Sequence, residues 1–317
     1  MVAKTTLGKS GRAVGRIGLG TMGMSFGYDP HGRDDARSIA VIRSAIELGA
    51  NLIDTADVYG PFNNEELVGQ AIRGHRDAVV LSTKGGLLVK DYNFETNGKP
   101  DYLRQAVDAS LKRLGVDHID LYFLHRVDPD VPLEESWGAL AEIVEGGKLG
   151  ALGLSAVALD EIKRAEAVHP VAAVQSELSL FDRTVLADVL PYTVENGIAF
   201  LPFSPLGRGI LTGTFGGQTD VPKDDWRLTL PQFSENGLAA YRESVETVRK
   251  IAREHGATPG QVALAWLLSK GEYVIPIPGT KTPRYLEENT AATELRLTAN
   301  DIANLDALEL PTRDRVG

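Results

Sequence analysis

The chain has 317 residues, of which 43% are hydrophobic and 24% charged, and its formal net charge is −10. This composition is typical of a folded globular protein, and the negative charge argues against a general nucleic-acid-binding surface. Cysteine is absent, which excludes disulfides, thiolate metal ligands and a cysteine nucleophile. The sequence shows no long apolar span, so we expect a cytoplasmic protein without a membrane partner. No metal site is expected, because the histidines lack metal-ligand spacing.

Apolar strand-like runs alternate with amphipathic helical windows at a pitch of roughly 30 residues, the length of one strand–helix unit. The polar N-terminal stretch carries a turn signal at residues 8–11 and is expected to form a β-hairpin. The later runs are nearly all apolar, as parallel strands buried on both faces should be. They cover residues 16–19, 51–53, 78–82, 118–124, 151–154, 171–174, 198–201 and 273–275. We expect one domain over residues 1–317, since α/β barrels reach this length as a single domain.

The windows between these runs carry helix signals. The first has apolar residues at helical spacing, begins at the acidic pair Asp34 and Asp35, and ends at Gly49. Gly115 and Gly146 are expected to end later helices.

Three segments stand outside the alternation. Residues 85–99 form a short excursion, and residues 205–235 are too long for an ordinary connection, which favours a functional loop. Residues 300–317 are expected to form one more helix and a polar tail.

Polar side chains stand at or just beyond the ends of three consecutive strand candidates. Asp54 and Tyr59 follow the second run, Lys84 follows the third, and His125 ends the fourth. Barrel enzymes assemble their chemistry at the C-terminal ends of strands, so we expect these side chains to share one rim. The Lys84 ammonium would lower the pKa of Tyr59, Asp54 would hold Lys84 protonated, and His125 would orient a substrate oxygen. Such a set suits protonation of a carbonyl oxygen while a cofactor supplies hydride to the carbon.

The sequence resembles the aldo-keto reductase superfamily across essentially its whole length. The shared segments are Asn51-Leu-Ile-Asp-Thr-Ala-Asp-Val-Tyr-Gly60, Leu81-Ser-Thr-Lys-Gly85, Asp120-Leu-Tyr-Phe-Leu-His125, Gly153-Leu-Ser155 and Ile277-Pro-Gly-Thr-Lys281. Gly18-Leu-Gly-Thr-Met-Gly-Met24 and Phe203-Ser-Pro-Leu-Gly-Arg-Gly209 are most similar to a microbial and plant branch. That branch includes auxin-induced-type reductases and resembles potassium-channel β subunits. The resemblance implies a (β/α)8 TIM barrel with an extra C-terminal helix, and a catalytic tetrad of Asp54, Tyr59, Lys84 and His125 with Tyr59 as general acid.

The same resemblance implies that NADPH binds in extended form. Polar side chains would hold its carboxamide, an aromatic face would stack on its nicotinamide ring, and loop amides with a guanidinium would hold its pyrophosphate. Lys281 beside a helix over residues 283–291 favours NADPH over NADH, since it would bind the additional phosphate. The residues assigned to the cofactor are Thr21, Met22, Asp54, Ser155, Gln175, Phe203, Ser204, Pro205, Leu206, Arg208, Gly279, Thr280, Lys281, Glu288 and Asn289.

Two positions depart from the common family pattern. Ala156 follows Ser155 where many members have Asn, which removes one amide contact. Tyr285 stands where Gln or Arg often precedes the Glu–Asn pair, so adenine could be stacked rather than hydrogen-bonded. Plainer interpretations also stay open: Lys281 and Arg284 could be ordinary surface charges, and Phe203 could belong to the core.

We therefore expect an NADPH-dependent oxidoreductase that reduces a small aldehyde or ketone to an alcohol. One alternative is an NADPH-binding sensor or regulatory subunit on the same barrel. Another is a lyase in which Lys84 forms a Schiff base. The loops around Met24, Asn93 and Trp226, which would select the substrate, resemble the family least, so the sequence predicts neither the substrate nor the oligomeric state.

Overall fold

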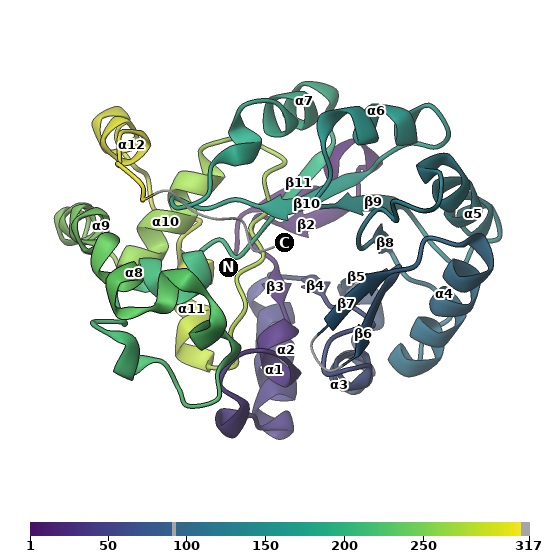
Figure 1. Ribbon diagram of the computed structural model, residues 1–317, viewed down its shortest axis with the longest axis horizontal. Helices are drawn as coiled ribbons and strands as arrows, with labels where there is room; N and C mark the ends of the chain where they lie inside the picture. The colour runs from purple at the N-terminus through teal and green to yellow at the C-terminus, as the bar shows by residue number, and fades with distance from the viewer. Residues whose placement is uncertain (91–92, 312–317) are drawn as a thin grey trace.

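Parallel strands form a barrel in the computed structural model, which describes residues 1–90 and 93–311 (Figure 1). The strands of the main sheet follow the order β11-β10-β9-β8-β5-β4-β3, and each pairs with its neighbour in parallel register. Their bounds are β3 Leu19–Gly20, β4 Leu52–Asp54, β5 Val80–Gly85, β8 Leu121–Leu124, β9 Leu152–Ser155, β10 Ala173–Glu177 and β11 Ala199–Phe203. The predicted barrel class is confirmed. Several strands extend one to three residues beyond the predicted runs.

An irregular segment, residues 273–279, closes the barrel between β11 and β3. On one side, the Ile275 N–H donates to Phe200 O at 2.8 Å and the Ile277 N–H to Pro202 O at 3.1 Å. On the other side, the carbonyls of Pro276 and Pro278 accept from backbone N–H groups at 3.0 and 3.3 Å. Because proline has no N–H, Pro276 and Pro278 cannot donate to the neighbouring strand, and only half of the hydrogen bonds of a regular ladder form on this side. The predicted strand 273–275 therefore occupies its expected place but forms isolated bridges instead of a regular strand.

The barrel interior is filled by alternate residues of each strand, because successive side chains of a strand point to opposite faces. The predicted N-terminal hairpin is confirmed as β1 Lys4–Thr6 and β2 Ala13–Gly15, which pair antiparallel. Two apolar residues of this hairpin region extend the interior cluster. The cluster comprises Leu7, Val14, Leu52, Val80, Leu121, Phe123, Ala173, Ala199, Leu201, Ile275 and Ile277.

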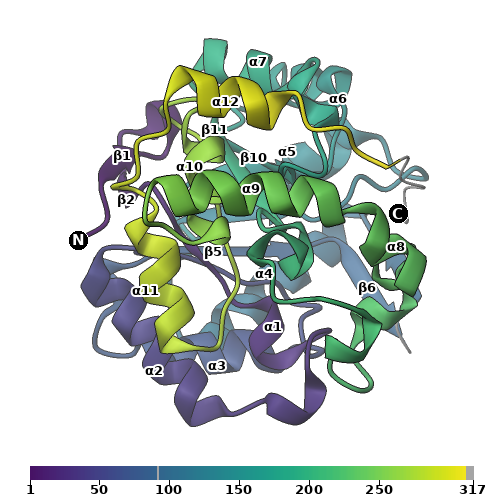
Figure 2. The same ribbon diagram turned by 90° about the vertical axis from the view of Figure 1, so that its left-hand side faces the viewer.

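Helices cover the outside of the barrel, as right-handed parallel connections require (Figures 1 and 2). Asp34 accepts from the Arg37 N–H and so caps α2, and Gly49 ends the helix in the left-handed conformation, as predicted. The bounds are α1 Met22–Ser25, α2 Asp35–Leu48, α3 Asn63–Ile72, α4 Pro100–Leu114, α5 Leu133–Glu145, α6 Leu159–Glu166, α7 Val189–Asn196, α8 Glu235–Ala240, α9 Arg242–Glu254, α10 Pro259–Leu268, α11 Pro283–Ala291 and α12 Ala299–Asp306. The extra C-terminal helix is thus confirmed as α12, and most of the predicted polar tail lies outside the described residues. Among the described helices, none is long and apolar enough to cross a membrane.

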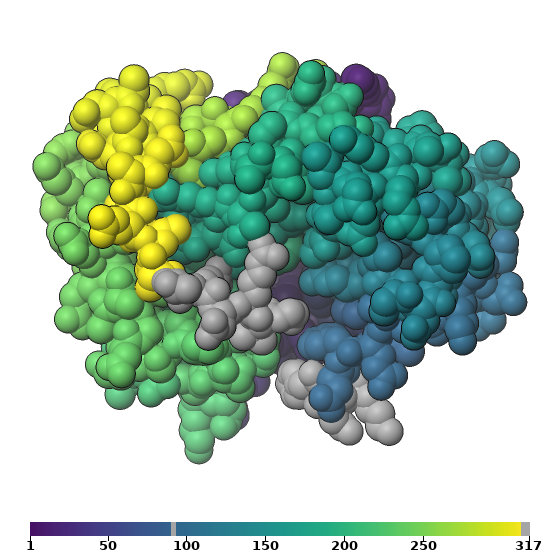
Figure 3. Space-filling model, turned by 45° about the horizontal axis from the view of Figure 1, so that its top comes forward, coloured from purple at the N-terminus to yellow at the C-terminus, as the bar shows by residue number. Residues whose placement is uncertain are grey.

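Two excursions follow the C-terminal ends of strands and therefore lie on the same face of the barrel. After β5, the strands β6 Leu87–Lys90 and β7 Asn93–Thr96 form an antiparallel hairpin. After β11, a long segment of short 3₁₀ turns runs to α8, and Trp226 N–H donates to Gly27 O at 3.0 Å. Figure 3 shows blue residues of the first excursion and green residues of the second on opposite sides of a hollow. The candidate site lies on this face.

Candidate active site

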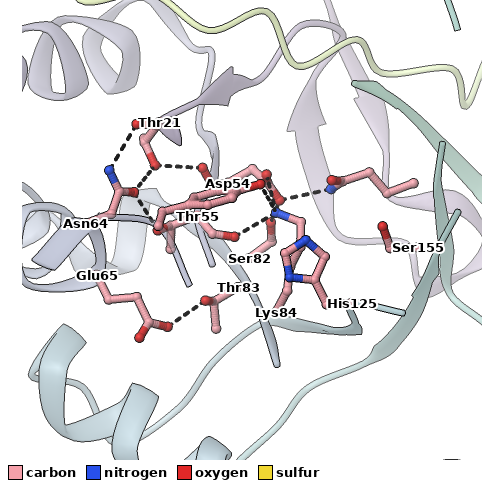
Figure 4. A network of polar contacts seen from close by, with 12 residues as sticks. Thr21, Asp54, Thr55, Asn64, Glu65, Ser82, Thr83, Lys84, His125 and Ser155 are labelled. Carbon is pink, nitrogen blue, oxygen red and sulfur yellow. Dashed lines mark hydrogen bonds and ion pairs between the residues drawn. The ribbon is translucent and has the colours of Figure 1, made fainter. Parts of the chain in front are cut away.

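Asp54, Lys84 and His125 lie together at the C-terminal end of the barrel (Figure 4), and Tyr59, the fourth predicted tetrad residue, adjoins Lys84 and His125. Asp54 is the last residue of β4, Lys84 lies near the end of β5, and His125 follows β8 directly. Tyr59 comes from the loop between β4 and α3. Lys84 Nζ is 2.7 Å from Asp54 Oδ1 and 3.5 Å from Tyr59 Oη, and the rings of Tyr59 and His125 meet edge to face with centroids 6.1 Å apart.

Asp54 is a buried carboxylate with a complete set of donors. In addition to Lys84, the hydroxyl of Ser82 donates to its Oδ2 at 2.6 Å and the Gln175 amide donates to the same atom at 3.0 Å. Ser82 and Lys84 are two residues apart on one strand and so point into the barrel together. Charge-assisted hydrogen bonds of this kind fix the position of the carboxylate.

Lys84 is fully buried, and its ammonium is bound on two sides. It donates to Asp54 Oδ1 and to the carbonyl of Thr55, both at 2.7 Å. Burial lowers the pKa of Lys84, but the adjacent Asp54 carboxylate and the Tyr59 hydroxyl outweigh burial, so its pKa is raised above the ordinary lysine value. The side chain is therefore a fixed ammonium at neutral pH, as the sequence predicted.

Tyr59 differs from the expectation in the direction of its pKa. Burial raises the pKa of Tyr59 and is the largest influence on it, whereas the Lys84 ammonium lowers it by a smaller amount. The net pKa lies above the ordinary tyrosine value, because the expectation counted the neighbouring charge but not the loss of solvent. The phenol therefore keeps its proton at neutral pH.

His125 is neutral at neutral pH. Burial lowers its pKa well below the ordinary histidine value, and the charges of Lys84 and Arg126 lower it further. Its Nδ1 is buried and has no hydrogen-bond partner among the described residues. A neutral imidazole can donate from one nitrogen and accept at the other, which suits contact with an uncharged substrate oxygen.

A buried asparagine that was not predicted from the sequence, Asn64, is linked to the backbone of Asp54 through Thr21. Asn64, at the start of α3, accepts from the hydroxyls of Thr21 at 2.6 Å and Thr55 at 2.7 Å. Its amide nitrogen donates to Thr21 O at 3.0 Å and to the Ser25 hydroxyl at 2.6 Å. Thr21 also reaches Asp54 O at 2.8 Å. Thr21 is thus fully buried beneath the site and does not lie on its surface, whereas Met22 is partly exposed. The two adjacent asparagines that begin α3 were the only sequence signal for this network.

The residues predicted to bind the nicotinamide end lie on the inner face of three neighbouring strands. Ser155 ends β9, Gln175 lies beside it on β10, and Phe203 ends β11 at the edge of the interior cluster. The Ser155 hydroxyl accepts from Arg126 Nη1 at 3.1 Å. Phe203 is partly exposed, so its ring is open on one side.

The loop after β11 has a backbone unlike the surrounding strands. Ser204 and Arg208 have φ values of 49° and 56°, in the left-handed region, and Leu206 lies between them at the surface. Arg208 Nη2 is 3.1 Å from Glu177 Oε2, and its guanidinium lies over the Trp226 ring at 5.3 Å. Arg208 Nε is buried without a partner among the described residues.

The residues predicted for the adenosine end lie just before α11 and in its second half, and the bounds of α11 match the predicted helix. Lys281 Nζ is 2.9 Å from Asp29 Oδ2 and donates to Asp29 O at 2.9 Å. Glu288 accepts from Arg284 Nε at 2.8 Å. Gly279 is exposed, Thr280 is partly exposed, and Asn289 is buried. The predicted phosphate-binding cations Arg208 and Lys281 thus hold carboxylates of the protein in this structure.

The comparison with known families decides the classification. A family model described as the Aldo/keto reductase family matches residues 16–310. The chain belongs to this family. It is 40% identical over 302 residues to the probable aldo-keto reductase 1 of Glycine max, which covers 94% of the chain and 86% of the soybean protein. Family membership implies an oxidoreductase.

Solved structures agree with this aldo-keto reductase fold. The glycerol dehydrogenase from Gluconobacter oxydans is 32% identical, with a TM-score of 0.84, and the match covers 93% of this chain and 91% of that one. An aldo/keto reductase from Klebsiella pneumoniae in complex with NADP and acetate is 28% identical, with a TM-score of 0.75, over 99% of this chain and 98% of that one.

This aldo-keto reductase also carries a buried acid that the sequence reasoning did not single out. Asp57 is 2% exposed, and its Oδ1 has no hydrogen-bond partner among the described residues. Burial, followed by the charge of Glu65, raises the pKa of Asp57 to about 8. The unfolded chain has the ordinary aspartate pKa of about 4, so the folded state binds more protons between these two values. Asp57 therefore contributes stability at low pH that is lost as the pH rises towards 8.

We expect Asp57→Asn to be more stable than the unmodified protein at pH 9, by at least about 1.4 kcal/mol, the equivalent of one pKa unit. The amide has nearly the shape of the protonated acid and avoids a buried charge at alkaline pH. Urea unfolding at pH 6 and pH 9 measures this, and the two proteins should differ less at pH 6. An equal difference at both pH values would show that Asp57 does not titrate as described.

Proposed function

We propose that this protein is an NADPH-dependent reductase that converts an aldehyde or ketone to an alcohol, with Tyr59 as the proton donor. The observation that carries the proposal is the protonated Tyr59 hydroxyl 3.5 Å from an ammonium that is itself ion-paired with buried Asp54 at 2.7 Å. Family membership supports it. So do the relatives, since one is a glycerol dehydrogenase and another was solved in complex with NADP.

Each tetrad residue has a defined task in this proposal. Tyr59 Oη donates its proton to the carbonyl oxygen as negative charge develops there. The Lys84 ammonium stabilises the resulting phenolate, and Asp54 keeps that ammonium in place and charged. His125, which is neutral and whose Nδ1 has no hydrogen-bond partner among the described residues, positions the carbonyl oxygen beside Tyr59. When bound, NADPH supplies the hydride.

The residues around the site fit such a cofactor. Ser155 and Gln175 offer hydrogen-bonding groups suited to a carboxamide, and Phe203 offers a partly open aromatic face. Arg208 has a buried Nε without a partner among the described residues, which an anionic group could satisfy. Ser204, which has a left-handed backbone, leads through Pro205 and Leu206 to Arg208, so this loop would offer backbone groups beside the guanidinium. The chain around Gly279 and Thr280 leads into the N-terminus of α11, and Glu288 and Asn289 lie in the second half of the same helix.

A Schiff-base lyase is disfavoured by the state of Lys84. A nucleophilic lysine needs a lowered pKa, whereas the pKa of Lys84 is raised by its partners. Its ammonium is also fully buried and paired on two sides.

The experiment that tests the function is a panel of aldehydes, ketones, quinones and keto-sugars, each assayed for NADPH oxidation at fixed protein concentration. The proposal predicts carbonyl-dependent oxidation with at least one class. A sensor that only holds the cofactor would bind NADPH and oxidise it with none.

Lys281 is proposed to select NADPH over NADH by contacting the additional phosphate. Lys281→Ala should raise the Kd for NADPH about tenfold or more and leave the Kd for NADH within about twofold, since a charge-assisted hydrogen bond contributes roughly 1.5–3 kcal/mol. The ion pair with Asp29 competes for the ammonium and reduces this effect. Fluorescence titration with both cofactors measures it, with Lys250→Ala on α9 as the control. An equal rise in the Kd for NADPH and for NADH would show that Lys281 does not select between the two cofactors.

A further inference from the structure

Arg126 places a guanidinium beside the tetrad, and the proposed mechanism does not use it. It follows His125 directly after β8, and its Nη1 donates to His125 O at 2.6 Å and to Ser155 Oγ at 3.1 Å. These bonds use both N–H groups of Nη1. They fix the guanidinium on the inner side of the rim, between two residues of the candidate site.

The other edge of this guanidinium is free. Nε and Nη2 of Arg126 make no hydrogen bond or ion pair with any residue in ranges 1–90 and 93–311. These atoms lie on one side of the group and form the edge that binds a carboxylate through two parallel hydrogen bonds. Two other partly buried arginines, by contrast, pair with carboxylates: Arg113 with Glu65 at 2.6 Å and Arg227 with Asp225 at 2.8 Å.

No carboxylate among residues 1–90 and 93–311 forms an ion pair with Arg126. Burial lowers the pKa of Arg126, and the nearby Tyr59 hydroxyl acts in the opposite direction to a smaller extent. An arginine keeps its charge in a protein, so this half-buried cation remains positive beside the reacting position. A half-buried charge without a partner is costly, and a bound anion would relieve that cost.

We propose that Arg126 is a specificity-determining residue that binds a carboxylate on the carbonyl substrate, so that the preferred substrates are oxo acids. The inference rests on the proposed reductase function and names the substrate class of the same site. The carboxylate is bound by the Nε and Nη2 edge and stays chemically unchanged, while the carbonyl at the other end of the molecule is reduced beside Tyr59.

The test compares oxo acids with their neutral methyl esters. Three pairs place the carboxylate one, two and three bonds from the carbonyl carbon, and kcat/KM is measured with NADPH for each member. The unmodified protein should prefer the acid in at least one pair. Arg126→Met should lower that acid-to-ester ratio about tenfold or more, and Arg126→Lys, which keeps the charge but not the two-donor edge, should give an intermediate ratio. Arg164→Met, an exposed ion-paired arginine on α6, should leave the ratio unchanged.

The possible outcomes distinguish a failure of this inference from a failure of the proposed reductase function. If acids and esters lose kcat/KM equally in Arg126→Met, Arg126 only positions His125 and Ser155, and the inference is overturned while the reductase function stands. If Arg126→Met weakens NADPH binding with an unchanged ratio, the guanidinium serves the cofactor, which also overturns it. If the unmodified protein reduces no carbonyl compound, the proposed function itself fails.

Discussion

Replacing Tyr59 with phenylalanine is expected to lower kcat for carbonyl reduction by about 10³-fold or more, while NADPH binds with nearly its original Kd. In the proposed mechanism the substitution removes the proton that Tyr59 donates to the carbonyl oxygen, and it keeps the ring that packs against Phe26, with centroids 6.4 Å apart. Among the residues that the structure describes, the Tyr59 hydroxyl makes one long hydrogen bond, 3.5 Å from Lys84 Nζ, so folding stability should change little. Steady-state NADPH oxidation and a fluorescence titration with NADPH measure the two effects.

The matched control is Tyr192→Phe. The Tyr192 hydroxyl on α7 donates to Glu166 on α6 at 2.6 Å. Both helices cover the outside of the barrel, and neither residue belongs to the candidate site. Removal of this hydroxyl should therefore leave kcat unchanged. Turnover in Tyr59→Phe within about tenfold of the original would assign the proton to another donor. His125 would then be the next candidate.

Lys84→Met is expected to have the second largest effect, because it acts on catalysis and on stability together. It leaves the Asp54 carboxylate buried without its counter-ion, and breaking a buried ion pair in this way costs about 3–5 kcal/mol. It also removes the ammonium that stabilises the Tyr59 phenolate, so kcat should fall by about 10² or more. Urea unfolding gives the first effect, and kcat at saturating substrate gives the second.

A double variant separates the two effects of Lys84. Asp54→Asn combined with Lys84→Met removes both charges and should regain much of the lost stability, since no buried charge is left unpaired. It should not regain activity, because the ammonium is still missing. Recovery of activity in the double variant would mean that Lys84 only holds the fold together.

The placement of the tetrad could be predicted from local sequence, because each residue ends an apolar run and parallel strands bring their C-terminal ends to one rim. The inner positions Ser155, Gln175 and Phe203 follow from the period of two along their strands. The α11 bounds were also predictable, since Thr282 and Pro283 are typical of a helix start. These features depend on neighbours in sequence.

Features that depend on contacts between distant segments were not predictable. The irregular eighth strand results from Pro276 and Pro278, whose carbonyls accept from Gly18 and Gly20 but which have no N–H to donate in return. The raised pKa of Tyr59 results from burial, which no motif reports. Asn64 and Arg126 were missed because their partners, such as Thr21 and Ser155, lie about thirty or more positions away in the chain.

The central claim is that this barrel reduces a carbonyl compound with NADPH through Tyr59, and a single-turnover measurement tests it most directly. Protein in excess over NADPH, deuterated at the transferred position, is mixed with the best substrate of the panel while the NADPH absorbance is followed. The account predicts loss of that absorbance, one alcohol formed per NADPH consumed, and deuterium on the alcohol carbon. Unchanged absorbance in the presence of every carbonyl class, with NADPH shown to be bound, would contradict it.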